Sequence, residues 1–284
     1  MTRSSNGVAI RNVLVHLDAA ACAAARLRAA RAVARRFGAE VFAQLCIEPS
    51  LAAMRLAIAE SPAALFETRA ALALEQAQLW FAQRAAGDAA GTWLEPSGAD
   101  AAEAFVRQAR CADLVVMGTL EAAATPDSMS PPGLTEAVLL RSGRPVLLMP
   151  AQVQRWEADV QTVVVGWNGS SHSARAVAAA LPWMQAARHV HVLVSRRAGQ
   201  ACEVDGLDLH GALVRHGIEA TMHADPGDAP GDDAGMRLAR LAGEVGAGIV
   251  VMGAYGHGRL QEQVWGGATA TMLRSAPLPV LMAH

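Results

Sequence analysis

The sequence predicts an α/β protein made of two tandem, doubly wound domains, each built on a five-stranded parallel sheet. Three observations lead to this fold class. Segments of the first half recur in the second half, strand-like runs alternate with helix-like stretches, and the strand-like runs are continuously apolar. Continuous apolar runs are typical of strands buried on both faces, as in a parallel sheet covered by helices.

Three segments carry the repeat. They are Val13–Asp18 with Val163–Asn168, Ala112–Gly118 with Ala247–Gly253, and Leu140–Met149 with Leu273–Met282. A match of this length, in the same order, indicates two copies of one domain. We expect the copies at residues 8–150 and 159–284, with the seam between them at 150–159.

Each copy is expected to contain about five strands and about four helices. In the first copy the pattern predicts a helix over 20–37 that stops at Gly38, a strand over 41–47, and a long helical insertion over 61–86. The insertion is rich in Ala, Leu, Glu and Gln, which favour helix.

In the second copy a helix is predicted to begin at Ser170 or Ser171, because either serine can cap it. A strand over 189–195 and a short helix over 206–216 follow. The acidic stretch that ends in Asp233 is expected to be a loop whose last aspartate caps the next helix.

The composition excludes several classes of function. Hydrophobic residues make up 52% of the chain and charged residues 18%, as in a globular protein. The net charge is −2 without a basic cluster, which argues against nucleic acid as a partner. All 24 cationic residues are arginine, which excludes a P-loop lysine and a Schiff-base lysine.

The same composition bears on location. The four cysteines form no CxxC pair and are expected to be free thiols in a reducing cytosol. No signal peptide is recognised and no apolar run approaches the ~20 residues of a membrane span. We therefore expect a soluble, cytoplasmic protein without a membrane or nucleic-acid partner.

One glycine-rich stretch indicates a ligand. It begins at Gly253, directly after the apolar run Gly248–Met252, and ends where a helix is predicted over 268–274. Glycines at such a junction let the backbone approach a ligand closely and direct free N–H groups at an anion. We expect a phosphate-holding loop at the carboxyl edge of a parallel sheet, where Asn168 also falls.

These residues resemble those of tandem universal stress proteins, which have two UspA-like domains in one chain. The resemblance covers 8–284 and implies a Rossmann-like, adenine nucleotide alpha hydrolase-like fold. Its most specific element is a Gly-x2-Gly-x9-Gly-(Ser/Thr) loop, matched here by Gly253, Gly256 and Gly266. Gly267 stands where the family has Ser or Thr, and it retains only a backbone N–H to offer a phosphate.

The resemblance implies that the second domain binds ATP or a related adenine nucleotide. The residues expected to contact it, besides those three glycines, are Asn168, Val194, His257, Arg259, Gly267 and Ala268. Val194, or Ser195 beside it, would offer a backbone contact to adenine. Asn168 replaces the family's aspartate and cannot give a carboxylate to Mg²⁺, which argues against Mg-dependent hydrolysis. We expect a regulatory role, with no catalytic residues and no metal site.

The first domain keeps Asp18 but has lost the loop. Only Gly118 and Gly133 remain, Glu121 places a negative charge where a phosphate would lie, and prolines remove N–H donors. We expect this domain to be structural.

Several side chains admit two interpretations. His257 and Arg259 would either contact phosphates or form a solvated loop face, and Tyr255 would either stack on a base or pack against the loop. His189 and His191 share a strand face and could form half of a metal site, but no third ligand is evident, so a structural role is favoured.

Three functions remain open at this stage. The first is a nucleotide-binding stress protein, the second is an interaction module that needs no nucleotide, and the third, weaker one is a nucleotide-dependent enzyme. The resemblance also implies pairing through the last strands, at 145–149 and 279–282, which would build an internal pseudo-dimer and could extend to a homodimer of the whole chain.

Overall fold

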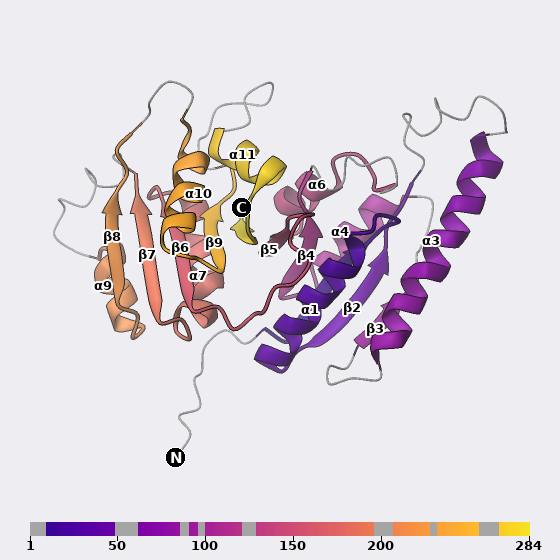
Figure 1. Ribbon diagram of the computed structural model, residues 1–284, viewed down its shortest axis with the longest axis horizontal. Coiled ribbons are helices and arrows are strands. Elements are labelled where there is room, and N and C mark those ends of the chain that lie inside the picture. Colours follow the sequence, from indigo (N-terminus) through magenta and orange to yellow (C-terminus); the bar gives the residue numbers. More distant parts are fainter. Residues whose placement is uncertain are drawn as a thin grey trace, which may run out of the picture. The chain divides into compact units, whose positions relative to one another are not determined.

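The computed structural model describes residues 10–48, 62–85, 91–95, 100–120, 129–195, 207–227, 232–255 and 267–284. Contacts divide this chain into two compact units, Ile10–Ala158 and Asp159–His284, called here the first and the second domain. Each is described by itself (Figure 1).

The first domain alternates strands and helices along the chain. Its elements are β1 (Asn12–Leu17), α1 (Ala23–Phe37), β2 (Glu40–Leu45), α3 (Pro62–Ala85), β3 (Gly91–Leu94), α4 (Ala101–Ala109), β4 (Leu114–Gly118), α6 (Leu134–Arg141) and β5 (Val146–Met149). The strands pair in parallel in the order β3-β2-β1-β4-β5, so β1 lies at the centre. In Figure 1, α1 and α3 lie on one face of this sheet, and α4 and α6 lie on the other.

The second domain repeats this arrangement. Its elements are β6 (Thr162–Trp167), α7 (Ser171–Met184), β7 (His189–Val194), α9 (Leu209–Arg215), β8 (Ala220–Ala224), α10 (Ala234–Glu244), β9 (Ile249–Gly253), α11 (Gly267–Ser275) and β10 (Val280–Ala283). The parallel order is β8-β7-β6-β9-β10, with β6 at the centre. In Figure 1, α10 lies on one face of the sheet and α7 on the opposite face.

The predicted fold class is confirmed. The central strands are buried on both faces, as their continuous apolar sequences indicate: Val13 and Val15 of β1, and Val163 and Val164 of β6, are at most 1% exposed. Each domain therefore has a single apolar sheet that its helices cover, and the polar ends of the strands are left as the place for a site.

Helix ends agree with the local sequence signals in three places. Gly38 follows α1 with φ of 68°, a left-handed conformation that glycine adopts without strain. Ser170 caps α7 by accepting the Ser173 N–H at 3.1 Å, and Asp233 caps α10 by accepting the Met236 N–H at 2.9 Å. None of the helices that the structure describes is long and apolar enough to cross a membrane.

Other boundaries differ from the prediction by a few residues. The helix expected from residue 20 begins at Ala23, because the Ala20 N–H binds Asp18 Oδ1 and Ala20 O accepts from Ala23 in a separate turn. The strand expected over 41–47 spans Glu40–Leu45. The short helix expected over 206–216 begins at Leu209, because Asp208 accepts the Gly211 N–H and caps it there.

Candidate functional site

The topology of each domain defines one place where a ligand would bind. In an open parallel sheet this place lies beyond the carboxyl ends of two neighbouring strands whose connections leave on opposite faces. It lies between β1 and β4 in the first domain and between β6 and β9 in the second. Asp18 follows β1, and Asn168 follows β6.

In the first domain, Asp18 is enclosed by its own hydrogen-bond network. Its Oδ1 accepts from Arg26 Nη2 at 2.5 Å and from the Ala20 N–H at 3.1 Å, and its Oδ2 accepts from the Ser130 hydroxyl at 3.0 Å. The side chains of Arg26 and Asp18 are only 2% and 1% exposed. This carboxylate is therefore neutralised within the fold and is not presented to a ligand.

Neighbouring groups close the first-domain crevice further. His16 Nε2 lies 3.1 Å from Cys46 O, and burial lowers the pKa of His16 to about 4, with Asp18 opposing and Arg26 adding to the shift. The imidazole is thus neutral at pH 7. Met129 O accepts the Glu48 N–H at 2.8 Å, which holds the segment beside Ser130 across the ends of β1 and β2.

In the second domain, Asn168 is half-buried and only partly engaged. Its Oδ1 accepts from the Ser170 N–H at 3.1 Å and from the Ser170 hydroxyl at 2.7 Å. Within the part of the chain that the structure describes, its Nδ2 donates no hydrogen bond. At the spacing where the first domain has Arg26, the second has Ala176, which has no polar side-chain group.

The end of β9 packs directly against the start of α7. A Cβ built on Gly253 would lie 2.5 Å from Ser173 N and 2.6 Å from the carbonyl carbon of His172, so only glycine fits there. Tyr255 follows with φ of 60°, and its N–H donates to Thr269 Oγ1 in α11 at 3.1 Å. The Tyr255 ring contacts the His284 ring edge-on, at 5.9 Å between centroids.

Of the other predicted site residues, three are described by the structure and four are not. Val194 ends β7 beside Trp167 of β6, and its carbonyl accepts the Asp225 N–H at 2.8 Å. Gly267 is the exposed first residue of α11, and Ala268 follows it, half-buried. Gly256, His257, Arg259 and Gly266 lie outside the described residues.

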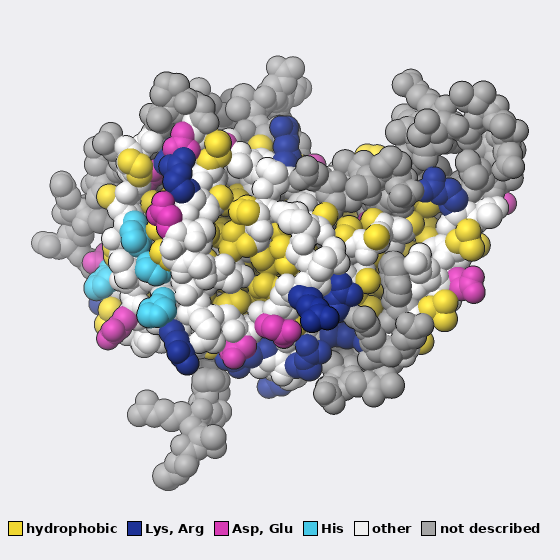
Figure 2. Space-filling model, in the orientation of Figure 1, with side chains coloured by type: hydrophobic (Ala, Val, Ile, Leu, Met, Phe, Trp, Pro, Cys, Tyr) yellow, Lys and Arg dark blue, Asp and Glu magenta, His cyan; other side chains and the backbone are white. Residues whose placement is uncertain are grey.

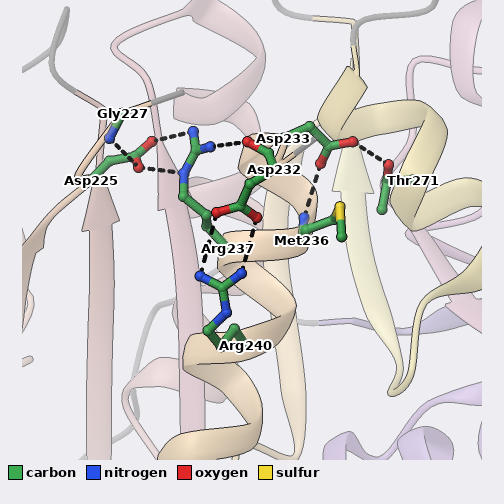
Figure 3. Close-up of polar contacts among 8 residues, drawn as sticks. All are labelled: Asp225, Gly227, Asp232, Asp233, Met236, Arg237, Arg240 and Thr271. Atoms are coloured by element: carbon green, nitrogen blue, oxygen red, sulfur yellow. Dashed lines mark hydrogen bonds and ion pairs between the residues drawn. The ribbon is translucent and has the colours of Figure 1, made fainter. Parts of the chain in front are cut away.

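A network of charged side chains occupies the same edge of the second domain (Figure 3). Arg237 of α10 binds Asp225 at the end of β8 through two bonds, Nε to Oδ1 at 2.6 Å and Nη2 to Oδ2 at 3.0 Å. Both side chains are buried, at 4% and 7% exposed. Arg240 binds Asp232 at 3.1 Å nearer the surface. The buried pair anchors α10 to the edge strand of the sheet.

Asp233 joins α10 to the start of α11. Its Oδ2 accepts from the Thr271 hydroxyl at 2.5 Å, while its Oδ1 caps α10 (Figure 3). A Cβ built on Gly267 would lie 3.2 Å from Asp233 Cβ and 3.5 Å from Asp233 Oδ2. A carboxylate thus lies beside Gly267 at the start of α11.

Sequence reasoning missed two of these arrangements. Arg26 and Asp18 come together across a turn that carries no motif, and His223 of β8 joins His191 of β7, with Nδ1 and Nε2 of the two rings 3.0 Å apart. Figure 2 shows histidine side chains (cyan) gathered over β7 and β8. Burial, and then His223 and His189, lower the pKa of His191. Among the described residues, no group of three or more His, Cys, Asp or Glu is arranged to hold a metal ion.

No protein-family model matches the sequence, and comparison with curated proteins finds no match. Solved structures do match. A universal stress protein from Archaeoglobus fulgidus aligns with a TM-score of 0.63 and 17% identity, over 96% of this chain and 95% of that one. A putative universal stress protein from Pseudomonas aeruginosa aligns with a TM-score of 0.57 and 15% identity, over 97% and 93%.

A functionally unknown protein from Pseudomonas aeruginosa gives a TM-score of 0.58 and 15% identity, over 97% of this chain and 92% of that chain. At such identities the shared property is the fold. It extends over nearly the whole length of each chain.

Proposed function

We propose that this chain, which has the fold of tandem universal stress proteins, is a cytoplasmic member of that family whose second domain binds an adenine nucleotide as a regulatory ligand. The nucleotide would lie beyond the ends of β6 and β9. The first domain would bind none and would serve as a structural partner.

The observation that carries the proposal is the difference at the two central strands. Asp18 is 1% exposed and bound by Arg26 and Ser130, whereas Asn168 is half-buried with an amide group still able to donate. A ligand would therefore meet an amide able to donate at the end of β6, whereas the carboxylate at the end of β1 is already bound within the fold.

The residues of the second domain fit an adenine nucleotide in the following way. Asn168 would donate to the ligand, and the backbone at Val194 would contact adenine. The loop from Gly253 through Gly256, His257, Arg259 and Gly266 would surround the phosphates. The backbone N–H groups of Gly267 and Ala268 would point at the anion, because the first N–H groups of a helix have no partner within it.

A regulatory role is favoured over a catalytic one. An amide at position 168 cannot act as a general base or give a carboxylate to a metal. Two described carboxylates at the carboxyl edge of the second-domain sheet already have partners within the protein. Asp225 binds Arg237, and Asp233 caps α10 and binds Thr271. A phosphoryl-transfer site needs groups that are free to position a nucleophile and to neutralise charge.

A second candidate function is an interaction module that needs no nucleotide. The Asp233 carboxylate beside Gly267 favours it, since negative charge at the start of α11 opposes an incoming phosphate. Pairing through the last strand of each domain, as an internal pseudo-dimer or a homodimer, remains a prediction of this candidate and of the first.

Calorimetric titration of nucleotide-stripped protein with AMP, ATP and GTP tests the proposal. We expect one site per chain for an adenine nucleotide, weaker binding of GTP, and at least about tenfold weaker adenine-nucleotide binding in Asn168→Ala. The control is Gln185→Ala at the opposite end of α7, where the side chain donates to His216 O and, among the described residues, to no other group. No heat from any nucleotide at millimolar concentration would discard the proposal and leave the interaction module.

A further inference from the structure

The packing of α10 against α11 places a negative charge at the site proposed above. A Cβ built on Gly235 would lie 2.8 Å from Ala268 O, so glycine at 235 permits the two helix starts to approach closely. This approach carries the side chain of Asp233 to the first residue of α11, 3.5 Å from where a Gly267 Cβ would be.

The Asp233 carboxylate is held in place by both of its oxygens. Oδ1 accepts the Met236 N–H at 2.9 Å and Oδ2 accepts the Thr271 hydroxyl at 2.5 Å. The two nearby arginines serve other carboxylates, Arg237 binding Asp225 and Arg240 binding Asp232 (Figure 3). Within the described residues, no ion pair neutralises Asp233.

The carboxylate therefore acts as an anion that the protein itself supplies at the start of α11. The positive end of a helix dipole attracts an anion, and Asp233 already meets that demand. A phosphate chain that approached the N–H groups of Gly267 and Ala268 would meet a like charge a few ångströms away, and each further phosphate would add to the repulsion.

We propose that Asp233 is a specificity-determining residue, which makes the second-domain site select adenosine or its monophosphate over ATP. This inference rests on the proposed function and names its ligand class: an adenine ligand with little or no phosphate charge. The adenine and ribose would provide the binding, and Asp233 would exclude longer phosphate chains.

The test is a set of calorimetric titrations with adenosine, AMP and ATP in EDTA, so that no divalent cation masks the phosphate charge. The wild-type protein is expected to bind adenosine and AMP at least about tenfold more tightly than ATP. Asp233→Asn should raise ATP affinity about tenfold and change adenosine affinity less than about twofold. Asparagine remains a good N-cap through its Oδ1, its amide N–H can donate to the Thr271 hydroxyl oxygen, and the negative charge is removed.

Asp232→Asn is the matched control. It removes the neighbouring carboxylate, which binds Arg240 rather than approaching Gly267, and should leave the order of the three ligands unchanged. Thermal unfolding of each variant reports whether it is folded. The relative affinities of the wild-type protein for adenosine, AMP and ATP are measured without any variant. They therefore test the inference even if Asp233→Asn fails to fold.

The outcomes separate this inference from the proposed function. If ATP binds wild-type protein as tightly as adenosine, or if Asp233→Asn leaves their ratio unchanged, the role of Asp233 is wrong while nucleotide binding stands. If none of the ligands binds either protein, the proposed function itself is wrong.

Discussion

In the part of the chain that the structure describes, each domain buries an aspartate–arginine pair at the carboxyl edge of its sheet, but the two pairs belong to different strands. In the first domain Asp18 and Arg26 lie at the end of β1, the central strand. In the second, Asp225 and Arg237 lie at the end of β8, the edge strand. The same interaction thus binds the residue after the central strand in one domain, whereas in the other it lies at the end of the edge strand, two strands from Asn168.

Asp18 of the first domain is bound within the fold although it stands where a ligand contact is expected. The sequence resemblance leads one to expect a ligand contact from an aspartate after the first strand, and only the first domain has an aspartate there. Its carboxylate nevertheless already accepts hydrogen bonds from Arg26, Ser130 and the Ala20 N–H. Retention of a motif residue therefore predicts ligand binding only if no other side chain has become its partner.

The largest expected effect comes from breaking the first-domain pair. Arg26→Met leaves the Asp18 carboxylate buried without its cation and should lower the free energy of unfolding by about 3–5 kcal/mol. The double variant Arg26→Met with Asp18→Asn removes both charges and should recover much of this loss. Urea unfolding measures the free energy of unfolding of both variants. Equal stability of the single and double variants would contradict the role of Arg26 as the cation that pairs with Asp18.

The next effect is the pH dependence that His16 gives the first domain; Gly166 stands in β6 where His16 stands in β1. Burial lowers the pKa of His16 from 6.5 to about 4, so the unfolded state binds a proton that the folded state rejects as the pH falls. This contribution to stability is complete above pH 6.5. It is lost towards pH 4, by about 3 kcal/mol.

Unfolding measured between pH 7 and pH 4 checks this contribution. His16→Gln keeps a donor for Cys46 O and should flatten the pH dependence, whereas His216→Gln, at an exposed position, should follow wild type. A His16→Gln profile parallel to that of wild type would show that the imidazole does not titrate on unfolding.

A smaller effect distinguishes the N-terminus of α1 from that of α7, the first helix of each domain. Ser170 caps α7 with its hydroxyl, whereas Cys22, at the same place before α1, makes no side-chain cap. Ser170→Ala should cost about 1 kcal/mol, and Cys22→Ala should cost less at the cap. Thermal unfolding compares the two, and an equal or larger loss in Cys22→Ala would contradict this assignment.

The smallest effect concerns the histidine pair of β7 and β8. The pKa of His191 is lowered by burial and then by its neighbours His223 and His189, so protonating His191 opposes folding as the pH falls below 6.5. Solvent screening should hold the cost below about 1 kcal/mol. An NMR titration should show the His191 pKa rising in His223→Ala, and an unchanged value would exclude coupling between the rings.

The sequence allowed the fold to be predicted because the repeated apolar runs and the caps at Gly38, Ser170 and Asp233 are local signals. The site was less predictable, since its decisive contacts depend on packing. Asp233 reaches Gly267 only because Gly235 lets α10 and α11 approach, and His223 reaches His191 only through the register of β7 and β8. Neither contact has a signature in the spacing of residues along the chain.

The most direct test of the central claim is hydrogen exchange of the whole chain, followed by mass spectrometry, with and without AMP. We expect slower exchange in peptides that contain Asn168–Ser173 and Gly267–Thr271 of the second domain, and no change in peptides covering His16–Arg26 and Met129–Leu134 of the first. Protection in the first domain, or in neither, would contradict the claim that only the second domain binds an adenine nucleotide.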